Sequence, residues 1–377
     1  MENTPSYERY QRQVLLNELG ELGQQKLMDA KVLVIGAGGL GCPVLQYLAA
    51  AGIGTIGIVD DDIVALHNLH RQPLYSTEEI GLPKAILAAG KMRALNPGIT
   101  INYFNETLTV QNAIGILKSF DIVVDATDNF ATRYLVNDVS VLLKKTLVYG
   151  AISRYEGQVA VFNCNTAGQS AEPANYRDLF PDPPAEGEIL NCAEAGVLGV
   201  LPGIIGAMMA NETIKIIAGI GKPLINRMLT FNALNNQSFE FEILPRPNTR
   251  SMIPGTAKAF EAMDYKALCA AAVIADEIEP WEFDTLISSG NVDVIDVRER
   301  DEKPFVNEFE HFCIPAAKIG SRINELNQST IVLFCQTGQR SRNAAGLLTC
   351  IFGDTRKVFS LKGGIQRWKQ QHKSPAQ

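Results

Sequence analysis

One stretch, Lys31 to Asp62, sets most of what this chain can fold into. It opens with a short apolar run, Val32 to Ile35, of the kind that a buried parallel strand needs. Three glycines follow in the pattern G-x-G-x-x-G, where a helix would begin: Gly36, Gly38 and Gly41. Such glycines let the backbone lie against a phosphate, while free N–H groups and the positive end of the helix face the anion.

A second strand and an acid follow the glycines. A helix over residues 42–51 is predicted to stop at Gly52, and Ile53 to Val59 form the next strand, which ends on Asp60. That acid lies about twenty residues beyond the glycines, where a ribose-binding acid is expected. A glycine motif alone could be a structural turn. Placed between two strands and before an acid, it predicts a mononucleotide or dinucleotide site.

Length and composition limit the classes of protein to which this chain can belong. At 377 residues, with 20% charged and 46% hydrophobic residues, the chain is expected to form two globular domains. The net charge of -7 argues against nonspecific nucleic-acid binding. Glycines, a proline and charges interrupt the longest apolar stretch, Ala195 to Gly221, so we predict a core helix and no membrane span. The first residues are polar and charged, so we expect no signal peptide. The seven cysteines have no paired spacing, which favours free thiols in a reducing cytoplasm.

Phosphate-binding side chains come after the second strand. Asn68, Arg71 and Gln72 lie close together, and Lys84 follows a Gly-Leu-Pro turn at the head of a predicted helix. The planar fork of Arg and the point charge of Lys suit a polyphosphate better than a nicotinamide ring.

The next predicted strand, Ile122 to Val124, ends in the segment Asp125 to Asn129. An acid at the carboxyl end of such a strand lies in the ligand crevice, and Mg²⁺ prefers carboxylates together with phosphate oxygens. Asp128 is therefore a magnesium candidate. It could equally be the N-cap of a helix that starts near Phe130.

These motifs together resemble the MoeB/ThiF family, whose members are similar to ubiquitin-activating enzymes and adenylate the C-terminal Gly-Gly of small sulfur-carrier proteins. The shared motifs are GAGGLG, VDDD, NLHRQ, PKA, DATDN and CAEAGVLGVLPGIIG, between about Tyr7 and Leu244. The resemblance implies an α/β fold, with a Rossmann-like doubly wound adenylation domain over residues 1–245. Beside Gly36, Gly38 and Gly41, it implies a set of contacts to ATP and its metal: Gly39, Asp60, Asn68, Arg71, Lys84, Asp128 and Asn129.

The resemblance also implies a role for Arg12, which by itself is most simply a solvated charge. In a homodimer it would reach the ATP phosphates of the partner subunit. Adenylation needs no protein nucleophile, because a carboxylate attacks the α-phosphorus and expels pyrophosphate. Positioning and charge neutralisation by Arg71, Lys84, Arg12 and an Mg²⁺ ion on Asp128 should supply most of the rate.

Many relatives hold a structural zinc between two Cys-x-x-Cys pairs, and here both pairs are missing. The first position reads Asn-Tyr-Arg-Asp at residues 175–178, and residues 249–255 contain no cysteine. Structural zinc needs four N or S ligands, mostly thiolates. We therefore predict no zinc site, with the segment Pro181 to Pro184 held by packing alone.

Different roles are predicted for the cysteines of the first domain. Cys192 follows an acidic loop and could be a small buried hydrophobe, as free cysteines usually are. The resemblance favours a catalytic role, since in some relatives the matching cysteine takes the acyl group as a thioester or acyl disulfide. Cys42 and Cys164 are expected in the core, because no activating group stands beside them.

A new pattern starts near Ile278. A short helix and two strands are predicted, and the second strand, Ile331 to Phe334, leads into Cys335 and the loop Gln336 to Arg340 before another helix. A cysteine at the tip of a buried strand and before a helix N-terminus lies in an electropositive pocket. Backbone N–H groups, the helix dipole and Arg340 would stabilise a thiolate or persulfide there.

This region resembles a rhodanese (sulfurtransferase) domain through IDVRE, HFCIPAA, CQTGQR and LKGGIQRW. The resemblance implies a second, smaller α/β domain over residues 278–377, in which Cys335 carries sulfur taken from thiosulfate or a donor such as a cysteine desulfurase. Prolines mark residues 246–277 as a linker with a helical segment. The remaining cysteines are interpreted as structural: Cys269, Cys313 and Cys350.

Joined, the two domains predict an adenylyltransferase that activates a carrier's terminal carboxylate and then receives sulfur from Cys335, giving a thiocarboxylate and AMP. One alternative is an NAD-dependent oxidoreductase, which leaves Arg71, Lys84 and the Cys335 loop unexplained. Another is a carrier-binding scaffold that no longer adenylates, which the missing zinc cysteines favour and the intact ATP motifs oppose. The carrier's pathway stays open among molybdenum cofactor, thiamine, tRNA thiolation and natural-product synthesis.

Overall fold

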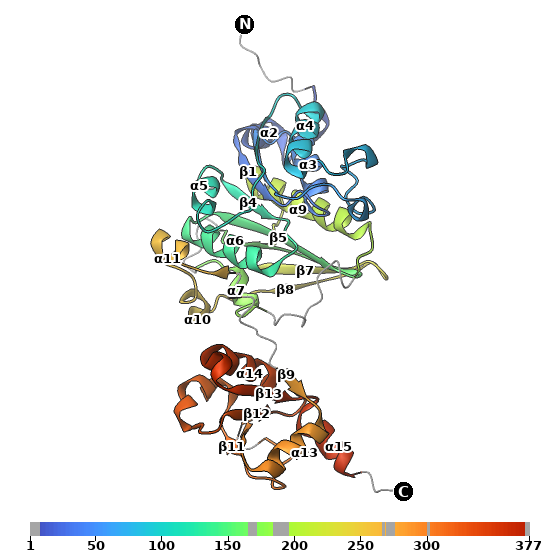
Figure 1. Cartoon of the computed structure of the whole chain (residues 1–377). Helices are drawn as coiled ribbons and strands as arrows, with labels where there is room; N and C mark the ends of the chain where they lie inside the picture. Colours follow the sequence, from blue (N-terminus) through green and yellow to red (C-terminus); the bar gives the residue numbers. More distant parts are fainter. Residues whose placement is uncertain are drawn as a thin grey trace. The chain divides into compact units, whose positions relative to one another are not determined.

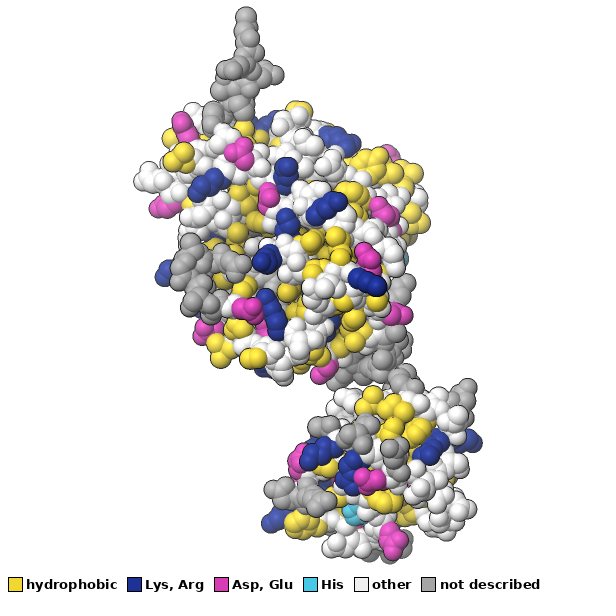
Figure 2. All heavy atoms as spheres, turned by 90° about the vertical axis from the view of Figure 1, so that its left-hand side faces the viewer, with side chains coloured by type: hydrophobic (Ala, Val, Ile, Leu, Met, Phe, Trp, Pro, Cys, Tyr) yellow, Lys and Arg dark blue, Asp and Glu magenta, His cyan; other side chains and the backbone are white. Residues whose placement is uncertain are grey.

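The computed structural model describes residues 8–164, 172–183, 196–265, 268, 276–299 and 302–373. The chain divides into two compact units (Figure 1). The first comprises residues 1–182 and 190–265, and the second comprises residues 183–189 and 266–377. Figure 2 shows basic and acidic side chains scattered among hydrophobic ones over the visible face of the first unit.

The first unit is built on an eight-stranded sheet in the order β3-β2-β1-β4-β5-β6-β7-β8. Five strands are parallel: β1 (Lys31–Ile35), β2 (Thr55–Val59), β3 (Thr100–Phe104), β4 (Ile122–Asp125) and β5 (Thr146–Ser153). Three antiparallel strands extend the sheet: β6 (Glu156–Phe162), β7 (Arg227–Asn232) and β8 (Gln237–Glu242). The strand order reverses between β1 and β4, and ligands of such sheets bind at this point. The predicted doubly wound fold is confirmed.

Helices cover this sheet. The chain runs through α1 (Gln11–Val14), α2 (Gly20–Asp29), α3 (Gly41–Ala51), η1 (Leu66–Asn68), η2 (Thr77–Glu79), α4 (Lys84–Leu95), α5 (Ala113–Leu117), α6 (Phe130–Leu142), α7 (Tyr176–Leu179) and α9 (Leu201–Ala218). The helices α3 and α9 pack on each other and share one core with β1 and β5. The predicted core helix of the apolar stretch is α9. Among the described residues, no helix has both the length and the apolar character needed to cross a membrane.

The segment predicted to link the domains is divided between the units. It contains α10 (Pro247–Arg250) and α11 (Ala257–Glu261), and residues 246–265 belong to the first unit. Phe260 and Tyr265 are buried there and their rings pack together. The other end, from Asp276, enters the first strand of the second unit.

The second unit is a five-stranded parallel sheet in the order β11-β10-β12-β13-β9. Its elements are β9 (Asp276–Ile278), α13 (Pro280–Ser289), β10 (Asp293–Asp296), β11 (Phe312–Cys313), η3 (Ala316–Ser321), η4 (Ile323–Glu325), β12 (Thr330–Phe334), α14 (Gln339–Phe352), η5 (Gly353–Thr355), β13 (Lys357–Leu361) and α15 (Gly364–Lys373). Side chains alternate across a strand. Ile331 and Leu333 therefore join the core under α14, while Val332 and Phe334 join the core with α13 and α15.

Candidate active sites

The glycine loop leaves β1 in a conformation that only glycine adopts easily. Gly36 has a φ of +95°, and a Cβ added there would lie 2.8 Å from the carbonyl oxygen of Ala126. A Cβ on Gly41 would lie 1.9 Å from the carbonyl oxygen of Gly36. Both positions bring backbone against backbone at the point where α3 begins. The loop therefore exposes main-chain N–H groups and a helix N-terminus, as anion binding requires.

Asp60 braces this loop. Its Oδ2 accepts a 2.7 Å hydrogen bond from the N–H of Ala37, and its Oδ1 accepts a 2.9 Å bond from the N–H of Asp62. Burial raises the pKa of Asp60, against the lowering effect of these hydrogen bonds and of Lys84. The acid predicted to bind ribose thus also holds the glycine loop in place, which the spacing of residues did not reveal.

Lys84 lies at the first position of α4 and is buried. Its Nζ is 2.9 Å from Oδ2 of Asp62, an exposed carboxylate that the sequence did not single out as a partner. Tyr75 joins the same region to the glycine loop, because its hydroxyl donates to the carbonyl of Ala37 at 2.8 Å. A lysine held in this way offers a fixed positive charge beside the loop.

The NLHRQ segment lies on and after η1. Asn68 is buried, whereas Arg71 is half-buried and donates from Nη1 to the carbonyl of His67 at 2.9 Å. Gln72 is buried below the glycine loop, and a Cβ on Gly38 would lie 3.4 Å from its Nε2. A Cβ on Gly39 would instead meet the ring of Pro202, at 3.1 Å. The structure therefore brings the glycine loop, Gln72 and α9 together.

After the end of β4, the neighbouring residues Asp128 and Asn129 have different environments. Asn129 is the N-cap of α6, with its Oδ1 accepting a 2.9 Å hydrogen bond from the N–H of Thr132. The N-cap interpretation of Asp128 is therefore wrong, and its carboxylate is exposed at the carboxyl end of β4. Asp125 is buried, and its Oδ1 accepts bonds from the N–H and hydroxyl of Thr127 at 3.0 and 2.6 Å. Burial raises the pKa of Asp125.

Arg12 lies on α1 and is exposed. Three leucines of α2 and of the turn between α1 and α2 are also exposed, by 66%, 55% and 82%: Leu15, Leu16 and Leu22. Apolar side chains gathered in this way are typical of a contact surface.

A buried polar network occupies the residues where relatives carry the zinc cysteines. Asp178 accepts hydrogen bonds from the N–H of Arg246 at 2.9 Å, the hydroxyl of Thr249, and the N–H of Asn175 at 2.8 Å. Asp178 and Thr249 are almost fully buried. Directed hydrogen bonds therefore fix the chain that leads into Pro181, whereas the expectation that the segment Pro181 to Pro184 is held by packing alone stays a prediction.

In the second unit, Cys335 follows β12 and is 1% exposed. Its Sγ accepts a 3.2 Å hydrogen bond from the N–H of Gly338, which has a φ of +96°. A Cβ on Gly364 would lie 2.5 Å from the carbonyl oxygen of Cys335, so the GG pair of LKGGIQRW packs directly on the loop. The predicted cysteine loop therefore forms around the sulfur.

Arg340 is not a lone cation at this loop. It forms a two-pronged ion pair with Glu302, in which Nη1 lies 2.8 Å from Oε2. The hydrogen bonding of Arg340 to Glu302 is the largest effect raising the pKa of Arg340, and Cys335 contributes less. A second arginine also contacts the loop, since Nη1 of Arg298 donates to Oε1 of Gln336 at 3.2 Å. Nothing in the sequence marked Glu302 as a partner, because residues far apart in the chain supply the pair.

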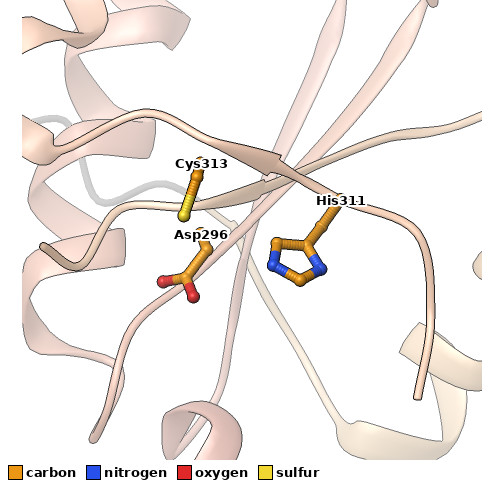
Figure 3. A group of neighbouring side chains, drawn as sticks. All are labelled: Asp296, His311 and Cys313. Carbon is orange, nitrogen blue, oxygen red and sulfur yellow. The ribbon is translucent and has the colours of Figure 1, made fainter. Parts of the chain in front are cut away.

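Figure 3 shows Asp296, His311 and Cys313, whose ligand-type atoms lie within 4.8 Å of one another. Both oxygens of Asp296 accept hydrogen bonds from Arg298, at 2.7 to 3.1 Å. Nδ1 of His311 lies 3.1 Å from the carbonyl oxygen of Phe309. The ion pair accounts for the carboxylate, so we interpret the group as a polar border of the sheet.

The remaining cysteines differ in environment. Cys42 and Cys164 are buried, as expected, and burial raises the pKa of Cys42 to about 12. Cys313 is half-buried on β11, and Cys350 lies in α14. The predictions for Cys192 and Cys269 concern positions outside the described residues.

Comparison with known proteins decides the family. Residues 10–252 match the ThiF family, and residues 279–371 match the rhodanese-like domain. The chain belongs to the ThiF family. This ThiF-family chain is 41% identical to the probable adenylyltransferase/sulfurtransferase MoeZ of Mycobacterium tuberculosis, across 96% of this chain and 93% of that protein.

Two other relatives carry names of the same kind of enzyme. The sulfur carrier protein adenylyltransferase of Thermus thermophilus is 50% identical over 70% of this chain and 96% of its own length. The adenylyltransferase and sulfurtransferase MOCS3 of Xenopus laevis is 34% identical over 97% of this chain and 87% of its own. The ThiF-family chain is therefore an enzyme with adenylyltransferase and sulfurtransferase activity, and the oxidoreductase alternative is set aside.

A solved structure supports the fold. The crystal structure of E. coli MccB with ATP has a TM-score of 0.52 and 21% sequence identity, covering 60% of this chain and 67% of that one. At this identity, the likeness concerns the fold of the adenylation unit alone.

Proposed function

We propose that this enzyme adenylates the C-terminal Gly-Gly carboxylate of a small ubiquitin-like sulfur carrier and then delivers sulfur from Cys335 to it. The observation that carries the proposal is one chain holding both a braced glycine loop with Lys84 and a cysteine loop closed around a sulfur. We assign adenylation to residues 1–245 and sulfur transfer to residues 278–377.

In the first step, an oxygen of the carrier carboxylate attacks the α-phosphorus of ATP, and pyrophosphate leaves with the electron pair of the broken P–O bond. The main-chain N–H groups of the glycine loop bind phosphate oxygens, and Asp60 binds the ribose. Lys84 and Arg71 offset the charge that gathers on the leaving group. Asn68 and Asn129 complete the nucleotide pocket.

Asp128 fits a magnesium ligand, since its carboxylate is exposed at the carboxyl end of β4 and does not cap a helix. The bound Mg²⁺ would neutralise phosphate charge. Arg12 would act across a homodimer, with exposed Leu15, Leu16 and Leu22 in the contact. The buried hydrogen bonds of Asp178 take over the role of a structural zinc.

In the second step, the terminal sulfur of the Cys335 persulfide attacks the acyl carbon, and AMP leaves with the electron pair of the broken C–O bond. A thiol then attacks the sulfur of Cys335 in the acyl disulfide, and the thiocarboxylate leaves with the electron pair of the broken S–S bond. Cys335 is left in a disulfide with that thiol, and a second thiol reduces this disulfide so that Cys335 can be reloaded. Cys192 is our candidate for a covalent partner in this transfer. A cysteine desulfurase is the class of donor that would reload Cys335.

ATP–pyrophosphate exchange with candidate Gly-Gly carriers tests the proposal. Asp128→Ala should abolish exchange, whereas Cys335→Ser should leave exchange intact and stop thiocarboxylate formation. Loss of exchange in both variants would contradict this division of labour between the units.

A further inference from the structure

We infer that Ser341, supported by Ser360, is a positioning residue that stabilises the anionic sulfur of Cys335. The inference rests on the proposed sulfur-carrying role of Cys335. Ser341 lies in the first turn of α14, and Ser360 lies on β13, the strand beside β12. Both hydroxyls are fully buried directly beneath the cysteine loop.

The contacts of the Ser341 hydroxyl form a branch point. Its oxygen lies 3.6 Å from Sγ of Cys335, 3.0 Å from the carbonyl oxygen of Gly338 and 2.9 Å from the hydroxyl oxygen of Ser360. Ser341 has one proton to donate, so it bonds either the carbonyl or the sulfur at a given moment. When Ser360 donates to Ser341, the proton of Ser341 is directed at these two acceptors.

The charge on Cys335 decides between the two acceptors. A neutral sulfur is a weak acceptor, so the carbonyl of Gly338 takes the proton. A thiolate is a much better acceptor, because hydrogen bonds to ionised groups are the stronger ones. The hydroxyl therefore turns to the sulfur when the anion forms, without any movement of the backbone.

The other polar groups at the loop do not fully stabilise an anionic sulfur on Cys335. The N–H of Gly338 already donates to Sγ at 3.2 Å. The charge of Arg340 is shared with Glu302, which engages both ends of the guanidinium group. A neutral hydroxyl on the buried side of the sulfur adds stabilisation that no acid cancels.

This donor acts in both halves of sulfur transfer. During loading, the Cys335 thiolate attacks a sulfane sulfur of the donor, and the donor leaves with the electron pair of the broken bond. During delivery to the carrier, the attacking thiol displaces the thiocarboxylate from Sγ of Cys335, and reduction of the resulting disulfide by a second thiol returns Cys335 as a thiolate. Ser341 stabilises the thiolate at the start of loading and again when that disulfide is reduced.

The test uses the full-length chain with Ser341→Ala, Ser360→Ala and the matched control Thr349→Ala. Thr349 is on the same helix, and its hydroxyl donates to the carbonyl of Ala345, away from the sulfur. The readouts are thiosulfate:cyanide sulfur transfer and the rate at which iodoacetamide modifies Cys335, followed by mass spectrometry of its peptide.

We expect Ser341→Ala to lower kcat about tenfold with little change in the thiosulfate KM, since one hydrogen bond to a charged group is lost. Modification of Cys335 should slow by a similar factor near neutral pH and recover at alkaline pH, where the thiolate forms regardless. Ser360→Ala should show a smaller effect in the same direction, and Thr349→Ala should match the unmodified enzyme.

Equal modification rates in Ser341→Ala and Thr349→Ala would overturn the inference. Should Ser341→Ala fail to fold, Ser360→Ala and Ser341→Thr decide: the first must slow modification and the second, which keeps a hydroxyl, must retain most of the rate. The variant Cys335→Ser distinguishes a failure of the proposed function from a failure of this inference. If that variant still transfers sulfur, the proposed function fails; if it does not while Ser341→Ala is fully active, only this inference fails.

Discussion

The guanidinium of Arg177 grips the carboxylate of Asp138 with two parallel hydrogen bonds, Nε to Oδ1 at 2.8 Å and Nη2 to Oδ2 at 2.7 Å. Both side chains are almost fully buried, and the hydroxyl of Tyr265 also donates to Oδ2, at 2.8 Å. Burial alone would lower the pKa of Arg177, but the bonds to Asp138 raise it. One carboxylate on α6 thus ties down both α7 and the end of the first unit.

Breaking this pair should destabilise the first unit strongly. Asp138→Ala leaves the Arg177 charge buried and unpaired, which costs about 3–5 kcal/mol of unfolding free energy. Tyr265→Phe removes one hydrogen bond to a charged group and should cost about 1.5–3 kcal/mol. Urea unfolding followed by circular dichroism measures both. The exposed pair of Arg227 and Glu240 is the control, and Glu240→Gln should change stability by about 0–1 kcal/mol.

A chelator should leave the first unit intact. Because hydrogen bonds to Asp178 hold the segment where relatives carry zinc ligands, we expect incubation with EDTA to leave the Tm unchanged. Elemental analysis of the purified protein should then show no stoichiometric zinc. A chelator-dependent fall in Tm together with bound zinc would contradict both expectations.

Alanine substitutions in the glycine loop should separate backbone geometry from general helix effects. Gly36→Ala places a Cβ 2.8 Å from a backbone oxygen at a φ of +95°, so we expect lost stability and greatly weakened ATP binding. Gly90, within α4, has open space around it and is the matched control. Gly90→Ala should stabilise the helix by about 0.5–1 kcal/mol and leave the ATP KM unchanged. Equal ATP affinity in both variants would argue against a phosphate contact at the loop.

Acid should weaken the second unit through Glu302. The hydrogen bond from Arg340 lowers the pKa of Glu302 below its ordinary value of 4.5 in the folded chain. Its stabilising contribution is therefore present above about pH 4.5 and lost as pH falls through the lower, folded-state pKa. Both tryptophans of the chain, Trp281 and Trp368, lie in this unit, so their fluorescence reports its unfolding.

The matched variant for this pH dependence is Glu302→Gln. It should be less stable than the unmodified chain near neutral pH, and the two should converge in acid once the carboxyl group is protonated. A stability difference that stays constant from neutral to acidic pH would show that the ion pair does not contribute as described.

Sequence reasoning succeeded where neighbouring residues determine the structure. Gly36 and Gly41 were predictable, because a strand, a tight turn and a helix follow one another within a few residues. The choice between Asp128 and Asn129 was not, since either can cap a helix and only the start of α6 decides. The partners of Asp178 were also hidden, because Arg246 and Thr249 lie about seventy residues away and meet it only through tertiary packing.

The strand β8 is the last strand of the sheet of the first unit, and no described residue pairs with its outer side. Phe239 is 67% exposed on it, and such an edge is a template on which strands of other molecules can add. Glu240 and Glu242 stand on the same strand, and Glu240 is held by Arg227 at 2.6 Å. A strand from another molecule that paired with β8 would have to place its backbone beside these charges. Charges at such an edge oppose strand addition, so replacing both acids with valine is expected to promote aggregation through β8.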